Sequence, residues 1–441
     1  MTDNQPLSQL REFLQRRGIT PIWGLAALLQ ILMVLILLLT WPVTPPVNLT
    51  LVVPAFEATY WSSLIHDFEA KNRNIRISLV EVKNRQGDLT EKLKEFYTIN
   101  FQSGNAYDLI YMDVIWISEF ADRGWLLDLS ERISRHELAK FLESDVIAGR
   151  YQGKLYRIPF RSDFGLLYYR KDLLEKAKLL PPKTFQELLK TSQALQKRRL
   201  APWGYLWQGR EYEGLSAMFV EVLQGYGGFW IKPASREVGL DRLEAIAAVK
   251  FLVNTMEQKI SPVEVVSYSE DESFTQFQQG HAVFLRGWPY MWTQANAPDS
   301  PIQGNVGIQA MTLHAKYRSG GGCNGSWGLG IAKTSKHPNQ AWKAIAYLTS
   351  AKVQHKFTLE TGYIPSRKTL LNDPKILRKY PHFPQLSQAL QHSVLRPPIP
   401  EYARASEILQ RYLNQALRRE SSPEEAMKAA ASETRQLLVN H

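Results

Sequence analysis

Apolar and polar residues alternate along most of the chain in a pattern that predicts short strands followed by helices. Residues 51–53 are a run of apolar residues typical of a buried strand, and residues 61–68 place apolar side chains at helical spacing. Residues 74–82 alternate with a period of two, which indicates a second strand, and residues 108–113 indicate a third, buried one. Strands that alternate with helices predict an α/β fold.

The same order of elements continues downstream. Residues 184–197 predict a helix that opens with a capping box, and residues 422–425 open the last helix in the same way. Residues 282–285 and 328–332 indicate further short strands. No repeat or linker divides residues 50–441, and two lobes joined by several chain crossings would have this pattern.

An uncharged segment precedes the first strand. No Lys, Arg, Asp or Glu occurs from residue 18 to residue 56, and residues 22–41 are almost entirely apolar. Twenty residues of helix rise about 30 Å, which is enough to cross the hydrocarbon core of a bilayer. Trp23 and Trp41 lie near its ends, where the headgroup region favours aromatic rings. We expect one transmembrane helix, with cytoplasmic arginines before it at Arg11, Arg16 and Arg17.

A cleaved signal peptide and a buried core helix are the alternatives for this segment. A signal peptide has a shorter apolar core and a small-residue cleavage site, whereas residues 41–46 contain no Ala-x-Ala. A core helix conflicts with the polar, unpatterned flanks. We expect a cytoplasmic N-terminus at residues 1–20, a transmembrane anchor or uncleaved signal at 21–41 and a Pro-rich linker at 42–49. The rest of the chain would lie on the periplasmic or extracellular side of the cell membrane.

Composition and charge narrow the classes of function. The chain has 441 residues, a formal net charge of +11 and one cysteine, Cys323, so no intramolecular disulfide can form. Basic residues are scattered among acidic ones without a nucleic-acid-binding signature, and we expect no nucleic-acid partner. Residues 136–140 lack the second histidine of an HExxH zinc site. The glycines of a G-x-G-x-x-G match at residues 320–325 precede a strand, which excludes a dinucleotide site. The sequence therefore predicts no metal and no cofactor.

Several segments together resemble one protein family. Residues 153–174 resemble the signature of maltose/trehalose-type solute-binding proteins of ABC transporters. Other segments resemble cleft-forming parts of that family in the same order along the chain: residues 107–116, 124–129, 287–292, 325–331, 361–367 and 396–400. Each match alone is moderately specific, and their common order over residues 50–441 makes the resemblance strong.

This resemblance implies a two-lobed α/β periplasmic-binding-protein fold with a hinge and an interlobe cleft. Residues 50–160 plus 295–348 would form lobe 1, and residues 161–294 plus 349–441 would form lobe 2. The implied function is that of a non-catalytic, extracytoplasmic subunit of an ABC importer. It would capture a disaccharide or glycosyl-polyol and deliver it to the transmembrane subunits of the permease. The apparent protein anchor and the residues 322–324 depart from the family pattern.

A sugar site needs carboxylates for hydroxyl groups and flat aromatic rings for C–H faces. The resemblance places such groups at six positions, which we expect to bind the ligand: Glu57, Asp113, Asp163, Trp288, Trp327 and Arg396. Trp116, Arg85 and Tyr402 are further candidates. Each has a structural alternative, because acids also cap helices and tryptophans also fill cores.

Two other functions are compatible with these residues. A membrane-anchored glycoside hydrolase could use two of the acids as a general acid and base, at a separation that sequence does not show. A sugar sensor subunit could signal through the N-terminal helix, but only about 20 residues precede that helix. The resemblance favours transport over both, with no catalytic residue.

Overall fold

The computed structural model describes residues 9, 12–13, 26–27, 29–34, 45–83, 89–104, 107–311, 321–390 and 393–439. The chain separates into two units, residues 1–46 and residues 47–441. Within the described residues, no helix combines the length and the apolar composition that a membrane crossing requires. Most of the expected anchor at residues 21–41 lies outside the described residues, so the transmembrane helix stays a prediction.

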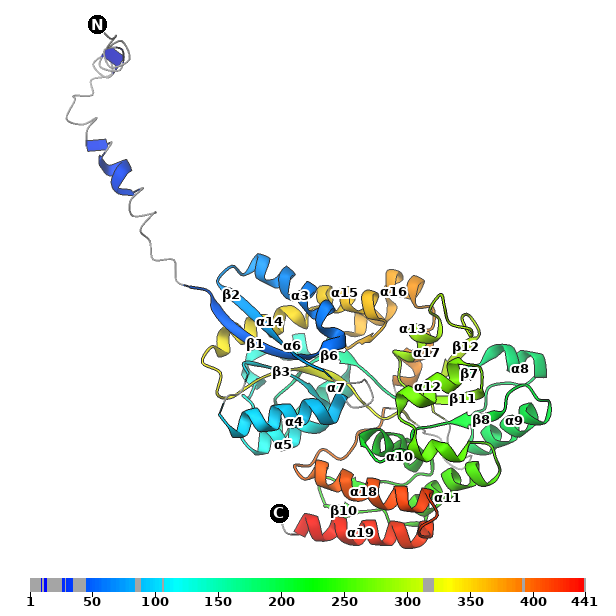
Figure 1. The fold of residues 1–441 in the computed structure, drawn as a ribbon. Helices are drawn as coiled ribbons and strands as arrows, with labels where there is room; N and C mark the ends of the chain where they lie inside the picture. Colours follow the sequence, from blue (N-terminus) through cyan, green and yellow to red (C-terminus); the bar gives the residue numbers. More distant parts are fainter. Residues whose placement is uncertain are drawn as a thin grey trace. The chain divides into compact units, whose positions relative to one another are not determined.

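A six-stranded sheet organises the first part of residues 47–441 (Figure 1). Its core is parallel, because β1 pairs with both β2 and β3, while β13 runs antiparallel between β3 and β6. The strand order is β14 (Ile364–Pro365), β6 (Ile158–Ser162), β13 (Trp327–Ile331), β3 (Leu109–Asp113), β1 (Val47–Pro54) and β2 (Ile75–Val82). The helices that accompany it are α3 (Ala58–Lys71), α4 (Leu89–Gln102), α5 (Ile117–Asp122), α6 (Arg135–Leu138), α7 (Glu143–Ile147), α14 (Pro338–Leu348) and α15 (Ala351–Thr361).

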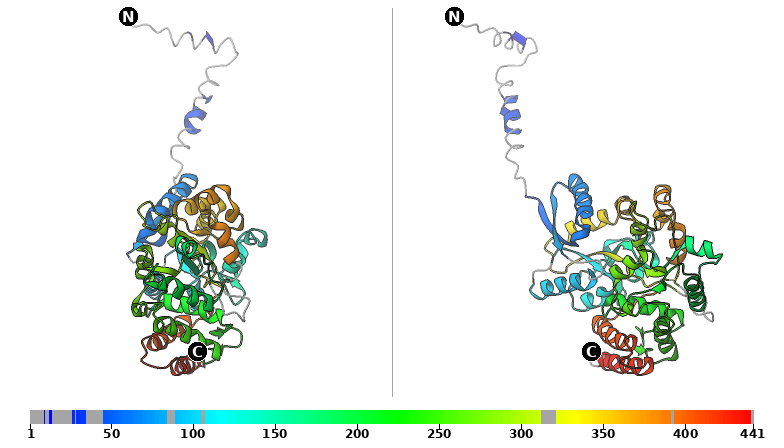
Figure 2. Two further views of the ribbon diagram at one scale, coloured as in Figure 1. Left: turned by 90° about the vertical axis from the view of Figure 1, so that its right-hand side faces the viewer. Right: turned by 45° about the vertical axis from the view of Figure 1, so that its right-hand side comes forward.

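A four-stranded sheet organises the second part. Its strand order is β12 (Val306–Gln309), β7 (Leu166–Arg170), β11 (Ala282–Gly287) and β8 (Trp203–Leu206). Its helices are α8 (Lys171–Ala177), α9 (Phe185–Lys197), α10 (Glu213–Gly225), α11 (Leu243–Glu257), α12 (Glu270–Gln278), α13 (Met291–Ala295), α16 (Pro374–Lys379), α17 (Phe383–Ala389), α18 (Tyr402–Leu417) and α19 (Pro423–Val439). The last two pack together beside the C-terminus (Figure 2). Two small ribbons complete the fold, β4 (Arg150–Tyr151) with β5 (Lys154–Leu155) and β9 (Ile231–Lys232) with β10 (Glu237–Val238).

Each sheet has its own hydrophobic core. Trp61, Phe68 and Phe160 belong to the core around the six-stranded sheet, and Tyr205 and Phe277 belong to the core around the four-stranded sheet. We name these two parts the first and the second lobe. The two-lobed α/β fold predicted from the sequence is therefore present.

The lobe boundaries differ from the expected ones at two segments. Residues 295–348 were expected in the first lobe, but β12 pairs with β7 in the second sheet. Residues 349–441 were expected in the second lobe, but α15 packs against α14 and α3 beside the first sheet. β12 and α15 are short elements, and their apolar pattern would be the same beside either sheet. Only the tertiary contacts therefore assign them to a lobe.

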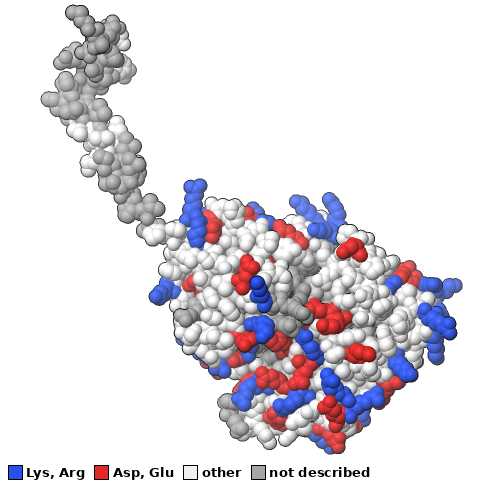
Figure 3. Space-filling model, viewed as in Figure 1, with Lys and Arg blue, Asp and Glu red and all other residues white. Residues whose placement is uncertain are grey.

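Local signals in the sequence agree well with the structure. The Thr184 hydroxyl accepts a hydrogen bond from the Glu187 amide at 3.1 Å, which is one half of the capping box predicted at the start of α9. The Glu187 carboxylate accepts from the Lys183 amide at 2.7 Å and not from Thr184. Ser422 and Glu425 make the reciprocal pair at the start of α19. The charges are also mixed as the sequence indicates, since basic and acidic side chains are interspersed on the face shown in Figure 3.

The hinge between the lobes contains the crossings from β6 to β7 and from β12 to β13, and a further crossing leads from β14 to α16. Residues 393–396, which join α17 to α18 within the second lobe, lie beside the second of these crossings. Phe164 forms a β-bridge with Asn324, and Cys323 forms one with Val394. The Gly165 amide donates to the Cys323 carbonyl at 3.1 Å. A side chain at Gly165 would not fit, because its Cβ would lie 1.7 Å from a Glu221 carboxylate oxygen. The unusual residues 322–324 thus belong to the hinge crossing from β12 to β13.

Glu221 connects this hinge to the core of the second lobe. Its carboxylate is fully buried and accepts two hydrogen bonds from Arg286, at 2.5 and 2.9 Å. The same carboxylate accepts from the Cys323 amide at 3.0 Å. A buried charge without its partner is strongly destabilising, so Glu221 and Arg286 depend on each other.

We predict that Glu221→Ala lowers the free energy of unfolding of the protein by about 3–5 kcal/mol, because Arg286 would remain as a buried, unpaired charge. Urea unfolding followed by circular dichroism measures this difference. The control is Glu433→Ala, which removes an exposed pair with Arg411 and should cost at most about 1 kcal/mol. Equal losses in the two variants would contradict the role assigned to Glu221.

Candidate ligand-binding cleft

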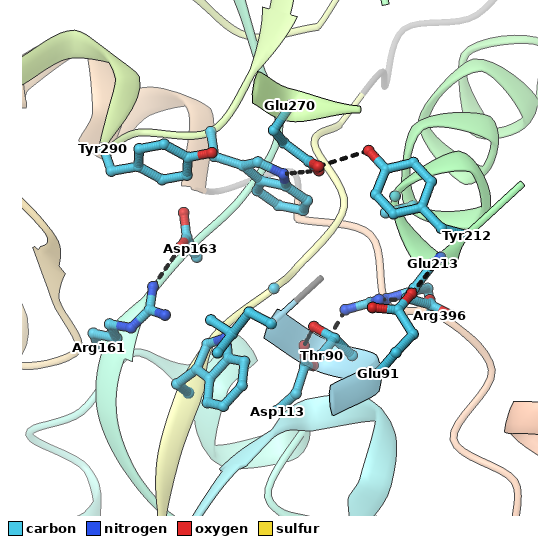
Figure 4. A pocket seen from close by; sticks show the side chains of 16 residues that line it. Thr90, Glu91, Asp113, Arg161, Asp163, Tyr212, Glu213, Glu270, Tyr290 and Arg396 are labelled. Atoms are coloured by element: carbon cyan, nitrogen blue, oxygen red, sulfur yellow. Dashed lines mark hydrogen bonds and ion pairs between the residues drawn. The ribbon is translucent and has the colours of Figure 1, made fainter. Parts of the chain in front are cut away.

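A cavity lies between the two lobes and is lined by both (Figure 4). Its empty space is about 570 Å³, including a part open to solvent. The first lobe contributes Thr90, Glu91, Asp113, Arg161 and Trp327, the second contributes Tyr212, Glu213, Glu270, Trp288, Tyr290 and Arg396, and the hinge contributes Asp163 and Gly325. The cavity therefore has charged and aromatic walls on both sides.

Five of the six principal sequence candidates line this cavity. They come from segments far apart in the chain and are Asp113, Asp163, Trp288, Trp327 and Arg396. Asp113 stands at the end of β3 and Trp327 at the start of the antiparallel β13, and the two residues pair directly in the sheet. The sheet register thus brings an acid and an indole ring to the same edge.

Glu57, the sixth candidate, lies behind the wall of the cavity. Its carboxylate is 1% exposed, accepts from the Trp61 indole at 3.1 Å and lies 3.6 Å from a terminal nitrogen of Arg161. Glu57 is not among the residues that line the cavity, whereas Arg161 is. The position of Glu57 therefore indicates support for Arg161.

The further candidates lie elsewhere. Trp116 is fully buried and packs edge-on against Trp327, with ring centroids 5.3 Å apart. Tyr402 is buried and donates a hydrogen bond to Glu213. Both border a neighbouring groove between the lobes and not the cavity itself. Arg85 lies outside the described residues.

Arg161 and Asp163 form one charged wall. The guanidinium of Arg161 donates to Asp163 at 2.7 Å and to the Tyr111 hydroxyl at 2.8 Å, and it stacks on the Tyr363 ring at 4.1 Å. The second carboxylate oxygen of Asp163 has no hydrogen-bond partner among the described residues, although the side chain is buried. Burial raises the pKa of Asp163 to about 7, despite the opposing charge of Arg161. The cavity wall thus contains one buried carboxyl oxygen that no described protein group satisfies.

Arg396 joins acids from the two lobes. It donates to Glu213 of the second lobe at 2.7 Å and to Asp113 of the first lobe at 3.3 Å. Asp113 also caps the turn after β3 by accepting from the Ile115 amide at 3.2 Å, and it accepts from the Thr90 hydroxyl at 3.2 Å. The capping role that sequence offered as an alternative for Asp113 is thus real, and the residue lines the cavity as well.

The aromatic wall of the second lobe is held by Glu270. One carboxylate oxygen accepts from the Trp288 indole at 3.0 Å, and the other accepts from the Tyr212 hydroxyl at 2.6 Å. Arg286 packs against the ring of Trp288 from within the lobe, 4.0 Å from the centroid. Trp288 is thus fixed at its edge and on one side, and both it and Tyr212 line the cavity.

Sequence reasoning missed several lining residues, namely Glu91, Arg161, Tyr212, Glu213, Glu270 and Tyr290. Arg161 had a detectable signal, because it is a charged residue inside the buried strand β6. Glu213 and Glu270 are the first residues of α10 and α12, where acids are common for helix stability alone. Such acids carry no signal that separates binding from capping.

Comparison with known proteins identifies the family of this chain. Residues 54–355 match the family described as bacterial extracellular solute-binding protein. A probable ABC transporter-binding protein of Deinococcus radiodurans is 30% identical over 73% of this chain and 77% of its own. A maltotriose-binding protein of Pyrococcus abyssi is 26% identical over 78% of this chain and 71% of its own.

Solved structures show the same similarity. T. maritima MalE3 with bound maltose is 32% identical, with a TM-score of 0.81 over 89% of this chain and 100% of its own. A solute-binding protein of an ABC transporter from Thermotoga lettingae, bound with α-D-tagatose, is 27% identical, with a TM-score of 0.78 over 89% and 100%. The family resemblance predicted from the sequence motifs is confirmed, and the chain belongs to the bacterial extracellular solute-binding proteins.

Proposed function

We propose that residues 47–441 capture a neutral carbohydrate of disaccharide size, or a glycosyl-polyol, and deliver it to the permease of an ABC importer. The observation that carries this proposal is the cavity between the lobes, where carboxylates and indole rings from both lobes face one another. Carboxylates accept hydroxyl hydrogen bonds, and aromatic faces bury the C–H groups of a sugar ring. Asp163, with one free oxygen, and Trp288 are the groups we assign to these two roles.

The relatives support this function. The named ligands of the Pyrococcus and T. maritima proteins are maltotriose and maltose, and the Deinococcus protein is described as an ABC transporter-binding protein. Their similarity spans most of this chain, including both lobes. Capture between lobes that close by hinge rotation is supported by the paired chain crossings at residues 163–165 and 322–325.

A glycoside hydrolase would need two carboxyls free to act as acid and base across one bond. Asp113 instead accepts from Arg396, Thr90 and the Ile115 amide, and Glu57 lies behind Arg161. These pairings favour binding over hydrolysis. We therefore propose that the protein returns its ligand chemically unchanged.

We further propose that residues 21–41 anchor the protein in the cell membrane, with residues 42–49 as a spacer. The support is the uncharged stretch from residue 18 to residue 56 and the arginines before it. The soluble lobes would then capture sugar at the outer surface beside the permease. Retention of the intact chain in the membrane fraction after alkaline washing is the expected result, and release of a shorter chain would contradict the anchor.

We predict that the purified protein binds at least one of maltose, trehalose, sucrose and glucosylglycerol in calorimetry, and that chromatography recovers the ligand intact. Galacturonic acid is the control for an anionic sugar, which the acid-rich cavity should reject. Recovery of hydrolysed sugar would favour the glycosidase. Absence of binding to every neutral carbohydrate would contradict the proposed function.

We predict that Trp288→Ala weakens binding of the tightest of these sugars about 100-fold, because the ligand would lose its stacking surface. Trp288→Phe should restore part of the affinity, since it keeps an aromatic face. The matched control is Trp342→Ala, which removes an indole from α14 outside the cavity. Circular dichroism checks that all three variants are folded. Unchanged affinity in Trp288→Ala would remove this residue from the site.

A further inference from the structure

Glu91 makes a contact across the boundary between the lobes. It lies in the first turn of α4 in the first lobe, and its carboxyl accepts a hydrogen bond from the Glu213 amide at 2.7 Å. Glu213 is the first residue of α10 in the second lobe. The residue before it, Tyr212, provides no side-chain cap for this helix. The first lobe therefore supplies the cap for a helix of the second lobe, as Figure 4 shows.

The surroundings of Glu91 disfavour a negative charge on its carboxyl group. No Lys or Arg among the described residues forms an ion pair with it, and the nearby Arg396 is bound to Asp113 and Glu213. Burial raises the pKa of Glu91 to about 7, and the charges of Glu213 and Glu270 act in the same direction. The helix N-terminus and the amide hydrogen bond favour the charged form, but they do not offset burial.

The groups around Glu91 are mostly acidic. Its own helix contributes Lys94 and Glu95, and the segment that leads into α10 contributes Glu211 and Tyr212. The remaining titratable or charged groups that line the cavity and the neighbouring groove are Asp113, Arg161, Asp163, Glu213, Glu270, Tyr290, Arg396, Tyr402 and Glu407. The cations of this set are bound to other acids: Arg161 to Asp163, Arg396 to Asp113 and Glu213, and Lys94 to Glu119.

We propose that Glu91 is a positioning residue for lobe closure. With a neutral carboxyl group, Glu91 caps α10 across the lobe boundary and holds the lobes together. With a charged carboxylate, it opposes their closure. This inference rests on the proposed function, because closure around a sugar is the step that Glu91 would control. Glu91 does not need to touch the sugar for this role.

The direction of the pH effect follows from proton linkage. When the lobes separate, Glu91 becomes exposed to water and returns towards its ordinary pKa of 4.5. Because the pKa is about 7 with the lobes in contact, closure takes up a proton between these two values. Closure is therefore favoured as the pH falls from about 8 to 5 and is weakened as the pH rises through 7. Glutamine imitates the neutral carboxyl and should remove the contribution of Glu91 to this dependence, whereas Asp163, whose pKa is also about 7, is unchanged in the variant.

The experiment measures the distance between the lobes in the full chain without sugar. Spin labels are placed at Ile147→Cys in the first lobe and Leu243→Cys in the second, which are both exposed, while Cys323 is buried. We expect the closed population to rise severalfold from pH 8 to pH 6 with Glu91 present. In Glu91→Gln it should be high at both pH values. The control Glu95→Gln removes an exposed acid one turn along α4 and should behave like the parent.

Two further measurements distinguish the proposed role of Glu91 from misfolding of the variant. Glu270→Gln removes one of the like charges that raise the pKa of Glu91, so the midpoint of closure should move to lower pH. Stopped-flow tryptophan fluorescence with maltose as the probe should show about tenfold slower release at pH 8 in Glu91→Gln, and equal rates at pH 5.

A pH profile of the lobe distance that is the same in Glu91→Gln as in the parent would overturn the inference. So would greater opening of Glu91→Gln at pH 8. Because the distance measurement uses no sugar, it stands even if maltose does not bind. Failure of every sugar to bind would instead count against the proposed function alone.

Discussion

Arg161, Arg286 and Arg396 are almost completely buried where the lobes and the hinge meet. A buried guanidinium is tolerated only when carboxylates and other acceptors surround it, since the loss of one partner leaves an uncompensated charge. Each of the three arginines therefore needs at least one carboxylate beside it. Asp163 is bound to Arg161, Glu221 to Arg286, and Asp113 with Glu213 to Arg396. The shape of the cleft depends on these three charged clusters.

The clusters also decide which groups remain for a ligand. Most carboxylate oxygens of the cavity already accept from arginine, hydroxyl, indole or amide donors, as Glu213 and Glu270 do. Asp163 keeps one oxygen without a partner among the described residues. Rigidly held acceptors and rings lose little freedom when a sugar binds, which favours affinity. The acids therefore act mainly as a framework, and few of them are available for recognition.

The hinge and the binding wall share the same support. Glu221 binds the Cys323 amide in the hinge and the Arg286 guanidinium, and Arg286 packs against Trp288. Arg396 and Glu91 make further contacts between the lobes. Separation of the lobes must therefore break the contacts of Arg396 with Asp113 and of Glu91 with the Glu213 amide. This arrangement gives a physical link between the occupant of the cavity and the position of the lobes.

The sequence alone determined the α/β alternation and the order of the family segments, because apolar periodicity and local motifs are encoded within a few residues. Through the family resemblance it also proposed Asp113, Asp163, Trp288, Trp327 and Arg396 as site candidates, and these five line the cavity. Only the tertiary structure assigned β12 and α15 to their lobes and placed Glu57 behind Arg161. It alone brought Glu91 beside Glu213, 122 positions away in the chain. An acid in the first turn of a helix looks the same in sequence whether it faces solvent or a cleft, and only long-range packing distinguishes the two.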